Sequence, residues 1–220
     1  SDNTSGTHNT GSGYQSSFKN QTGNYNVAMG FQSLYYNIAT GNTAMGHIAL
    51  DGNATGTYNT AVGYDADVGF SNLTNATAIG NQATVSSSNT IQLGNASVID
   101  VRTSGDMTIG GTYYVSSDER LKKQIAGTSY GLASILALRP VNYQMKSNSS
   151  QRLGFLAQEL KLIIPEVVKG IEGDLTKGET LSVGYLELIP VLTKAIQEQQ
   201  ALIKQLQKDI DILKQKASKD

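Results

Sequence analysis

A five-residue motif that recurs along the first half of the chain constrains the fold more than any other feature of the sequence. The motif has the form Asn-Thr-Ala-x-Gly, in which x is apolar. The closing glycines lie 17, 16, 17, 17 and 14 residues apart. A fixed period of this kind predicts a repeat architecture. Clear copies are Asn26–Gly30, Asn42–Gly46, Asn59–Gly63 and Ala76–Gly80, and weaker copies are Asn9–Gly13 and Asn89–Gly94.

Each unit reads as a short strand followed by a glycine at which the chain must turn sharply. Strands this short cannot bury a core alone, because a single pair of them has too little apolar contact. Stacking one unit on the next, as in a β-solenoid, gives each strand two neighbours. The alternation within the strands predicts a buried ladder that consists of Val27, Met29, Ala44, Met45, Val62 and Ile79.

The predicted core of this array is thin, because most of its residues are small. A narrow solenoid of this kind buries little apolar area per residue, so we expect several copies of the chain to associate, and a homotrimer is the preferred state. Association would cover further apolar residues between the strands, namely Phe31, Leu34, Leu50, Tyr64 and Leu73.

The repeats over residues 9–98 resemble the parallel β-roll heads of trimeric autotransporter adhesins, and similar units occur in phage tail fibres and related surface fibres. The resemblance implies a fibre architecture without fixing what the fibre binds. After Val98 the period is lost, and Gly105–Gly111 indicates a β-hairpin or a neck that leads to the next domain.

The composition of the chain changes at Ser116. Residues 1–115 contain two basic and six acidic residues, sixteen of the 23 glycines and no proline, whereas residues 116–220 contain fifteen basic and twelve acidic residues and all three prolines. The two parts therefore carry net charges of about −4 and +3 by direct count. We expect a repeat head at 1–98, a neck at 99–115, a further domain at 116–185 and a long helix at 186–220.

Several functional classes are disfavoured by composition. No basic face is interleaved with aromatic residues, so we expect no nucleic-acid partner. The chain has no cysteine, which excludes disulfides and thiolate chemistry. No run of 18 apolar residues exists, which argues against a membrane span. The chain begins at Ser1 with neither a starting methionine nor a signal peptide, so we expect a fragment or a processed product.

The pattern after Lys123 predicts an α+β domain. A helix with an apolar face formed by Leu132, Ile135, Leu136 and Leu138 should end before Pro140. A strand over 141–145, a polar turn over 147–150 and a partner strand over 152–156 should follow. A short helix over 157–162 and a strand at 167–168 complete the prediction.

Four motifs in this second part resemble the intramolecular chaperone domain of phage tailspikes and endosialidases. They are Ser117–Lys123, Leu138–Val141, Gly154–Leu160 and Pro165–Val168, in the same order as in that family. The resemblance implies a domain that drives trimerisation of a fibrous protein and then releases itself by one self-cleavage. Carried over by position, it implies Ser117 as the nucleophile, Lys122 as its base and the Ser116–Ser117 bond as the cleavage site.

The residue inventory is compatible with that chemistry. A serine hydroxyl needs a base, and residues 116–220 contain neither histidine nor cysteine. A lysine can act as the base if desolvation or a neighbouring cation lowers its pKa, so Lys122 would have to be partly buried near Arg120 or Lys123. The alternative is structural, with Ser117 or Asp118 as the cap of a helical turn.

The last segment shows a heptad pattern over three repeats. Isoleucine at a and leucine at d favour two strands, which conflicts with the trimer that the resemblance implies. Gln199 at a d position weakens the dimer rule, so the trimer is preferred. Pro190 is expected in the first turn of the helix. The predicted seam consists of Leu192, Ile196, Gln199, Ile203, Leu206, Ile210 and Leu213.

No cofactor or metal is expected. His8 and His47, the only histidines, occupy equivalent borders of two repeats and are interpreted as surface or turn residues. A group of aromatic residues could stack on sugars or pack at a subunit interface, and packing is preferred. The group consists of Tyr35, Tyr36, Tyr58, Tyr64 and Phe70.

The sequence thus predicts a mainly β chain with an α+β C-terminal domain: a trimeric parallel β-roll, a chaperone domain and a coiled-coil helix. The expected role is attachment at a bacterial surface or virion tail, with a glycan or protein receptor. One alternative is the C-terminal part of a glycan-degrading tailspike, for which Asp65 and Asp67 are the candidate carboxylate pair. Another is a fragment of a membrane-anchored transcription factor with the same chaperone module.

Overall fold

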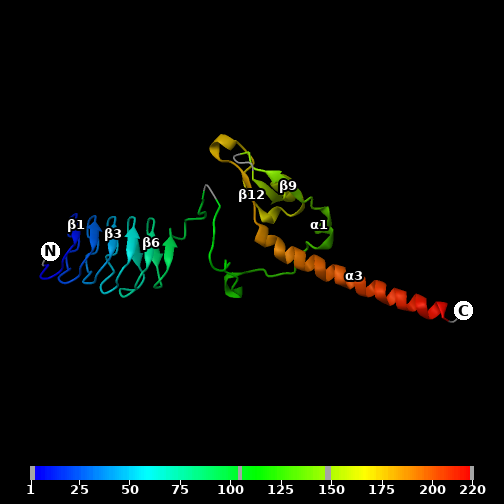
Figure 1. Ribbon diagram of the computed structural model, residues 1–220, viewed down its shortest axis with the longest axis horizontal. Coiled ribbons are helices and arrows are strands. Elements are labelled where there is room, and N and C mark those ends of the chain that lie inside the picture. The colour runs from blue at the N-terminus through cyan, green and yellow to red at the C-terminus, as the bar shows by residue number, and fades with distance from the viewer. Residues whose placement is uncertain (1–2, 104–105, 147–149, 219–220) are drawn as a thin grey trace. The chain divides into compact units, whose positions relative to one another are not determined.

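A computed structural model describes residues 3–103, 106–146 and 150–218. The chain divides into two compact units, Ser1–Tyr113 and Tyr114–Asp220, which are described separately below (Figure 1). Among the described residues, no helix is both long and apolar enough to cross a membrane.

The first unit is a β-solenoid, as the repeats predict. Its parallel six-stranded sheet has the order β1-β2-β3-β4-β6-β8, and β5 and β7 form a second, two-stranded parallel sheet. Each repeat contributes one strand to the large sheet, and the motifs align in register, with Ala28 opposite Ala44 and Ala44 opposite Ala61. The strands are β1 (Thr10–Ser12), β2 (Val27–Met29), β3 (Thr43–Met45), β4 (Thr60–Val62), β5 (Asp67–Val68), β6 (Thr77–Ile79), β7 (Thr84–Val85) and β8 (Ile91–Leu93).

The predicted core ladder is largely wrong, because the central side chain of each strand faces the interior and the side chain after it faces outward. The central alanines of β2, β3, β4 and β6 are completely buried. Of these alanines, only Ala44 was in the predicted ladder. The apolar residue that follows it is exposed, at 43% for Met29 and Met45. Val62 and Ile79 are exposed in the same way, and Val27 is half-buried. The interior of so narrow a solenoid accepts a methyl group at this position, so the larger side chains face outward.

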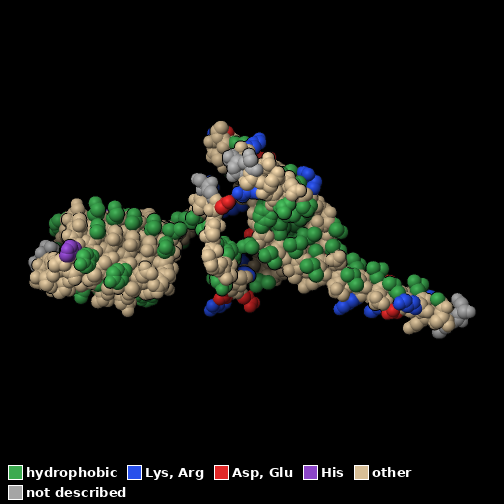
Figure 2. All heavy atoms as spheres, in the orientation of Figure 1, with side chains coloured by type: hydrophobic (Ala, Val, Ile, Leu, Met, Phe, Trp, Pro, Cys, Tyr) green, Lys and Arg blue, Asp and Glu red, His purple; other side chains and the backbone are tan. Residues whose placement is uncertain are grey.

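The prediction of which apolar residues need a partner chain is also partly wrong. Leu34, Leu50 and Leu73 are buried within one chain, where they form the core with the alanines, whereas Phe31 and Tyr64 remain exposed. Figure 2 shows apolar side chains in rows on the visible surface of the solenoid.

Buried asparagines connect successive turns. The side-chain Oδ1 of Asn26 accepts a hydrogen bond from the backbone N–H of Asn42 at 2.9 Å, and Asn42 accepts one from Asn59 in the same way. Asn9 and Asn59 continue this ladder at its two ends, toward Asn26 and Ala76. The first residue of the motif is therefore asparagine because its side chain satisfies a backbone amide that the strand ladder leaves free.

The closing glycines are required by the stacking of the turns. Gly63 has φ of +140°, and a Cβ built on it would lie 2.5 Å from the carbonyl oxygen of Gly80 in the next turn. Gly13, Gly30 and Gly46 have the same conformation and the same overlap with the next glycine. These positions exclude a side chain both by backbone conformation and by space.

The predicted hairpin in the neck is wrong for the residues that the structure describes. No strand is present in 99–103 or 106–115. Gly105 lies outside the described residues.

The second unit contains the predicted helix, hairpin and short helix. α1 (Leu132–Ala137) precedes the antiparallel pair β9 (Val141–Gln144) and β10 (Gln151–Gly154), and α2 (Ala157–Ile163) follows. Most of the predicted polar turn, 147–149, lies outside the described residues. Val167 ends a 3-10 helix, η2 (Pro165–Val167), and only Val168 begins the predicted strand β11 (Val168–Gly170), which pairs with β12 (Leu181–Val183).

The remaining elements of the second unit are helical. They are the 3-10 helices η1 (Glu119–Leu121), η3 (Leu175–Lys177) and η4 (Tyr185–Glu187) and the long helix α3 (Leu188–Ala217). The core of the unit lies where α2, η2 and the start of α3 pack together. Its buried residues are Leu160, Ile164, Val167, Leu188 and Val191. Pro190 lies in the first turn of α3, as predicted.

Candidate functional site

The 3-10 helix η1 brings the two predicted catalytic residues together. Asp118 caps this turn, because its Oδ1 accepts a hydrogen bond from the N–H of Arg120 at 2.9 Å. The N–H of Lys122 then closes the turn by donating to the carbonyl of Glu119 at 2.9 Å. Ser117 and Lys122 therefore flank one tight turn, five residues apart in the chain.

Lys122 and Ser117 are in direct contact across this turn. The Nζ of Lys122 donates a hydrogen bond to the Oγ of Ser117 at 2.7 Å. This is the distance at which a lysine could exchange a proton with a serine hydroxyl. The geometry is therefore compatible with a serine and lysine dyad that is held within a single segment of the chain.

In a single chain the serine and lysine of the dyad are exposed to solvent. Ser116, Ser117 and Lys122 are all exposed, so the partial burial expected for Lys122 is not provided by a single copy. Arg120, one of the two cations expected beside Lys122, is instead paired with Asp118, whose two carboxylate oxygens lie 3.0 and 3.2 Å from its Nε. This pairing holds the pKa of the Asp118 carboxyl below its ordinary value.

The structural alternative for the motif is partly correct, because Asp118 is the cap of the turn. Sequence reasoning named Asp118 only as a cap and did not foresee its ion pair with Arg120. A spacing of two residues between opposite charges could have indicated this pair. The pair fixes the turn and leaves Ser117 and Lys122 free to face each other.

The predicted helix seam lies on an exposed surface. Only Leu188, Val191 and Ala195 of α3 are buried, and every described residue from Gln199 to the end of the helix is exposed. The seam residues Ile203, Leu206 and Ile210 are 50%, 61% and 45% exposed. Apolar side chains along α3 are visible in Figure 2. The other seam residues, also exposed, are Leu192, Ile196, Gln199 and Leu213.

Further large apolar residues are exposed on the rest of the second unit. Leu136 of α1, Leu153 of β10 and Leu162 of α2 are 75%, 79% and 87% exposed. Large apolar side chains usually bury their area, and an exposed set of them marks an interaction surface. The second unit therefore presents apolar surface on its sheet as well as on its helices.

Asp65 and Asp67, the candidate carboxylate pair of a glycosidase, have different partners. Asp65 is within 3.5 Å of the amide of Gln82, whereas the carboxyl that interacts with Asp67 is that of Asp51. Burial, with the nearby charge of Asp51, raises the pKa of Asp67 to about 7. Two backbone N–H groups, those of Gly52 and Val68, donate to Asp67 and partly oppose this increase.

The two histidines occupy different positions in the repeat, so the prediction of equivalent positions is wrong. His8 stacks on Tyr25, with ring centroids 4.9 Å apart. His47 lies in another column, between Phe31 and Tyr64, at centroid distances of 5.0 and 5.2 Å. Within the described residues, no group of three or more His, Cys, Asp or Glu side chains could hold a metal ion.

The predicted aromatic group is dispersed among different contacts. Tyr35 stacks on Phe18 and meets the edge of Tyr36. Tyr64 belongs to the column of His47, and Tyr58 and Phe70 are 63% and 61% exposed. These contacts stabilise neighbouring turns of the solenoid through stacked rings.

Comparison with known proteins found a similarity for part of the second unit. Residues 117–169 match the family model described as chaperone of endosialidase, a stretch that begins at Ser117 and includes α1, β9, β10 and α2. A search of curated proteins found no match to the sequence. All four motifs that carry the resemblance lie within the matched residues. The chain therefore combines a β-solenoid with a C-terminal segment that is similar to the chaperone of endosialidase family.

Proposed function

We propose that this chain is a trimeric segment of a surface or tail fibre, in which the chaperone domain assembles three chains and then cleaves itself from the solenoid. The proposal assigns residues 1–98 to the shaft or head, 99–115 to the neck, 116–185 to the chaperone and 186–220 to a coiled coil. Its site is outside the cell, on a virion tail or a bacterial surface, where the solenoid attaches to a glycan or a protein.

The observation that carries the trimer is the exposed end of α3. Helices in water are marginal when they lack tertiary contacts, and every described residue of α3 from Gln199 onward is exposed. Its seam of Ile203, Leu206 and Ile210 repeats at heptad spacing. Burying this seam between copies supplies the missing contacts.

The repeats give a reason for a chaperone at the end of the chain. Units of nearly identical sequence pair almost equally well when they are shifted by one turn, so their register is weakly specified. A trimeric nucleus at the C-terminal end aligns three chains at one point. The solenoids then acquire their alignment from it.

The proposed cleavage uses Ser117 and Lys122. Lys122 in its neutral form accepts the proton of the Ser117 hydroxyl, and Oγ attacks the carbonyl carbon of Ser116. The C–N bond between Ser116 and Ser117 breaks, the amine of Ser117 takes up a proton, and the acyl group is left as an ester on Oγ. Water hydrolyses this ester, which gives a carboxylate at Ser116 and restores the hydroxyl of Ser117.

Assembly provides what the single chain lacks at this site. A neutral lysine is favoured by desolvation, and both dyad residues are exposed in one copy. Packing of neighbouring chains around η1 would exclude water from Lys122. Cleavage would thus follow correct assembly.

Intact-mass spectrometry of the purified chain tests the cleavage. The wild-type chain should be broken after Ser116, and Ser117→Ala and Lys122→Ala should remain whole. Two variants provide controls, since Ser116→Ala and Lys161→Ala, an exposed lysine of α2 outside the motif, should still be cut. A whole wild-type chain, or cleavage of the Ser117→Ala variant, would contradict the dyad and leave a chaperone that is retained.

A further inference from the structure

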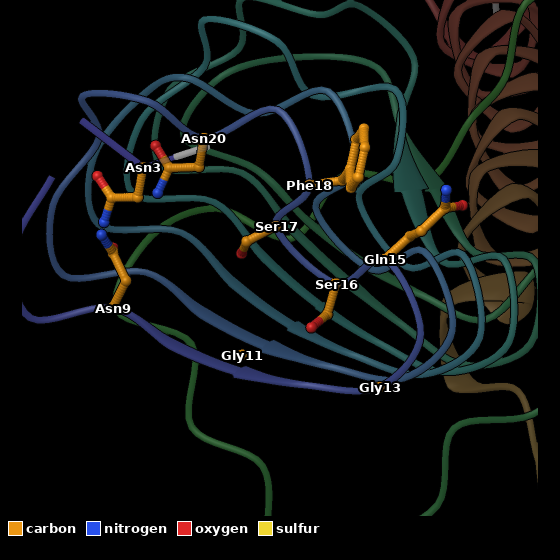
Figure 3. A pocket seen from close by; sticks show the side chains of 9 residues that line it. All are labelled: Asn3, Asn9, Gly11, Gly13, Gln15, Ser16, Ser17, Phe18 and Asn20. Carbon is orange, nitrogen blue, oxygen red and sulfur yellow. The ribbon is translucent and has the colours of Figure 1, made fainter. Parts of the chain in front are cut away.

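Each unit of the chain has a sizeable hollow, and the two hollows differ in character. The hollow at the first turn of the solenoid has a volume of about 460 Å³ and a polar lining that includes Asn9, Ser16 and Asn20 (Figure 3). The hollow in the second unit has a volume of about 560 Å³ and a mostly apolar lining. Exposed apolar surface of this kind is typical of a contact with another protein surface.

The hollow in the second unit is a groove along one side of α3. Ile189, Pro190 and Thr193 of the helix line it, together with Gly127 and Thr128 of the segment before α1. The space at Gly127 is open, because nothing lies within 4 Å of a Cβ built on this residue. The groove can therefore admit a side chain from another molecule.

The groove adjoins the predicted seam of α3. Ile189 lies three residues before Leu192 and seven before Ile196, so it extends the heptad pattern to one more a position. Ile189 is 55% exposed. Thr193, which follows Leu192 in the groove lining, occupies an e position. A helix that packs along the seam therefore passes beside the groove.

The opposite flank of the seam is attached to the rest of the second unit. Leu188 and Ala195 occupy g positions, and both are buried within the unit. Glu198, at the adjacent c position, accepts a hydrogen bond from the N–H of Leu132 at 2.8 Å, which attaches the start of α1 to this flank. Each α3 thus has the groove on its e side and α1 on its g side. In a parallel coiled coil the e side of one helix lies beside the g side of its neighbour.

We propose that the groove of one copy receives α1 of a neighbouring copy, with Leu136 as the inserted side chain. The inference rests on the proposed trimer, in which the three α3 helices are parallel. Leu136 suits the groove because it is large, apolar and 75% exposed in one chain. Each copy gives its α1 to one neighbour and its groove to the other, so three identical contacts close a ring.

This contact also supports the link between the dyad and the rest of the second unit. Every residue from Glu119 to Ser129 is exposed in one chain. Gly127 and Thr128, which line the groove, follow Lys122 by only five and six residues. A neighbouring α1 in the groove covers this link after assembly and not before it.

Disulfide cross-linking in the full chain tests the contact. The chain has no cysteine, so Thr128→Cys and Leu136→Cys each introduce a single thiol. Two chains with one of these substitutions each are co-expressed, both with Ser117→Ala to keep them whole and one with a C-terminal tag that changes its mass. A disulfide needs Cα atoms within about 7 Å, so mild oxidation should link the two different chains. Thr176→Cys, exposed on η3, replaces Thr128→Cys in the control and should give at least about tenfold less mixed product.

Leu192→Cys reports separately on the seam, because its thiols meet between parallel helices. A link at Leu192→Cys without the mixed product would overturn the contact of α1 and leave the coiled coil supported. Equal mixed product with Thr176→Cys would overturn the contact as well. No link at Leu192→Cys would overturn the coiled coil and this inference with it.

Amide hydrogen exchange measures whether the groove is covered. The amides of Gly127 and Thr128 should exchange at least about tenfold more slowly in the wild-type chain than in Leu136→Asp. Leu175→Asp, at a leucine of η3 that is 73% exposed, is the matched control and should leave their exchange as slow as in the wild type. Equal exchange in the wild type and in Leu136→Asp would show that α1 does not cover the groove.

Discussion

At the residue scale, asparagine and glycine have more specific roles than their periodicity indicates. The sequence predicts that the closing glycines form sharp turns, which their positive φ angles confirm. It does not reveal that a carbonyl of the next turn occupies the place of the missing Cβ. Nor does it reveal the asparagine ladder, because a contact between residues 17 apart appears only when the turns are stacked.

Gly63→Ala should destabilise the solenoid, because the new Cβ would meet the carbonyl oxygen of Gly80 and the residue would keep an unfavourable φ of +140°. We expect a loss of roughly 1–3 kcal/mol, measured by chemical denaturation. Gly111→Ala is the control, since nothing lies within 4 Å of a Cβ at that position. Equal stability of the two variants would contradict the packing argument.

Asn59→Ala should also destabilise the first unit. The Asn59 side chain accepts from the N–H of Ala76 at 2.9 Å and donates to the carbonyl of Leu73 at 2.7 Å. Its removal leaves buried polar groups unpaired, which costs about 1–3 kcal/mol for each. Thermal unfolding of Asn59→Ala beside Asn81→Ala, at an exposed position, measures the difference. A loss no larger than that of the control would refute the ladder.

The carboxyl of Asp67 should make stability depend on pH. Its pKa is raised to about 7 in the folded chain, so the folded state keeps a proton that the unfolded state releases near pH 4. Stability therefore falls as pH rises from about 4 to about 7 and stays low above that range.

Asp67→Asn removes this dependence, because the amide resembles the protonated carboxyl. Thermal unfolding should show a higher midpoint for the variant at pH 8 and little difference at pH 4, with a gain on the order of a few kcal/mol. Asp65→Asn, two residues away, is the control. A variant that gains equally at both pH values would exclude titration of Asp67 as the cause.

At the element scale, the types of the elements could be predicted better than the faces they present. The heptad and the hairpin each have enough residues to define a period, and α3, β9 and β10 match their predictions. The strands of the large sheet have three residues, and in β2, β3, β4 and β6 only the central one is buried. Hydrophobicity alone assigns the larger outward residues such as Met45 to the core, whereas the central, inward position of β2, β3, β4 and β6 is occupied by alanine.

The seam of α3 should determine the oligomeric state. Ile203→Asp puts a charge into the proposed interface between helices and should convert the trimer to a monomer in sedimentation equilibrium. Lys204→Asp, the next residue and outside the seam, should leave the trimer intact. A wild-type chain that is monomeric would contradict the trimer itself, and a dimer would support the pairing rule for isoleucine at a and leucine at d.

At the scale of the whole molecule, the approximate place of the division could be read from composition. The boundary between the two compact units lies between Tyr113 and Tyr114, close to the composition change at Ser116. The resemblance predicts Ser117 and Lys122 as partners, and their side chains are in contact, whereas their role in cleavage stays a prediction. The full exposure of both residues in a single chain could not be predicted, because a sequence motif does not describe how its surroundings pack.

Deletion of residues 116–220 should impair assembly of the solenoid. Without the chaperone domain nothing aligns the repeats of different chains, so we expect monomers and mixed aggregates in place of a uniform trimer. Sedimentation velocity with circular dichroism would measure size and strand content together. A uniform trimer formed by residues 1–115 alone would show that the repeats align themselves.

The column of stacked glycines limits which insertions and deletions the repeat region can accept. Since each turn contacts only the one before and the one after it, a gain or loss of a complete turn preserves every contact across the new boundary. A gain or loss of one residue instead moves Asn59 and Gly63 out of line with their neighbours. Unequal crossing-over between near-identical codons should therefore produce heads that differ in length by whole turns, while shorter insertions are removed by selection.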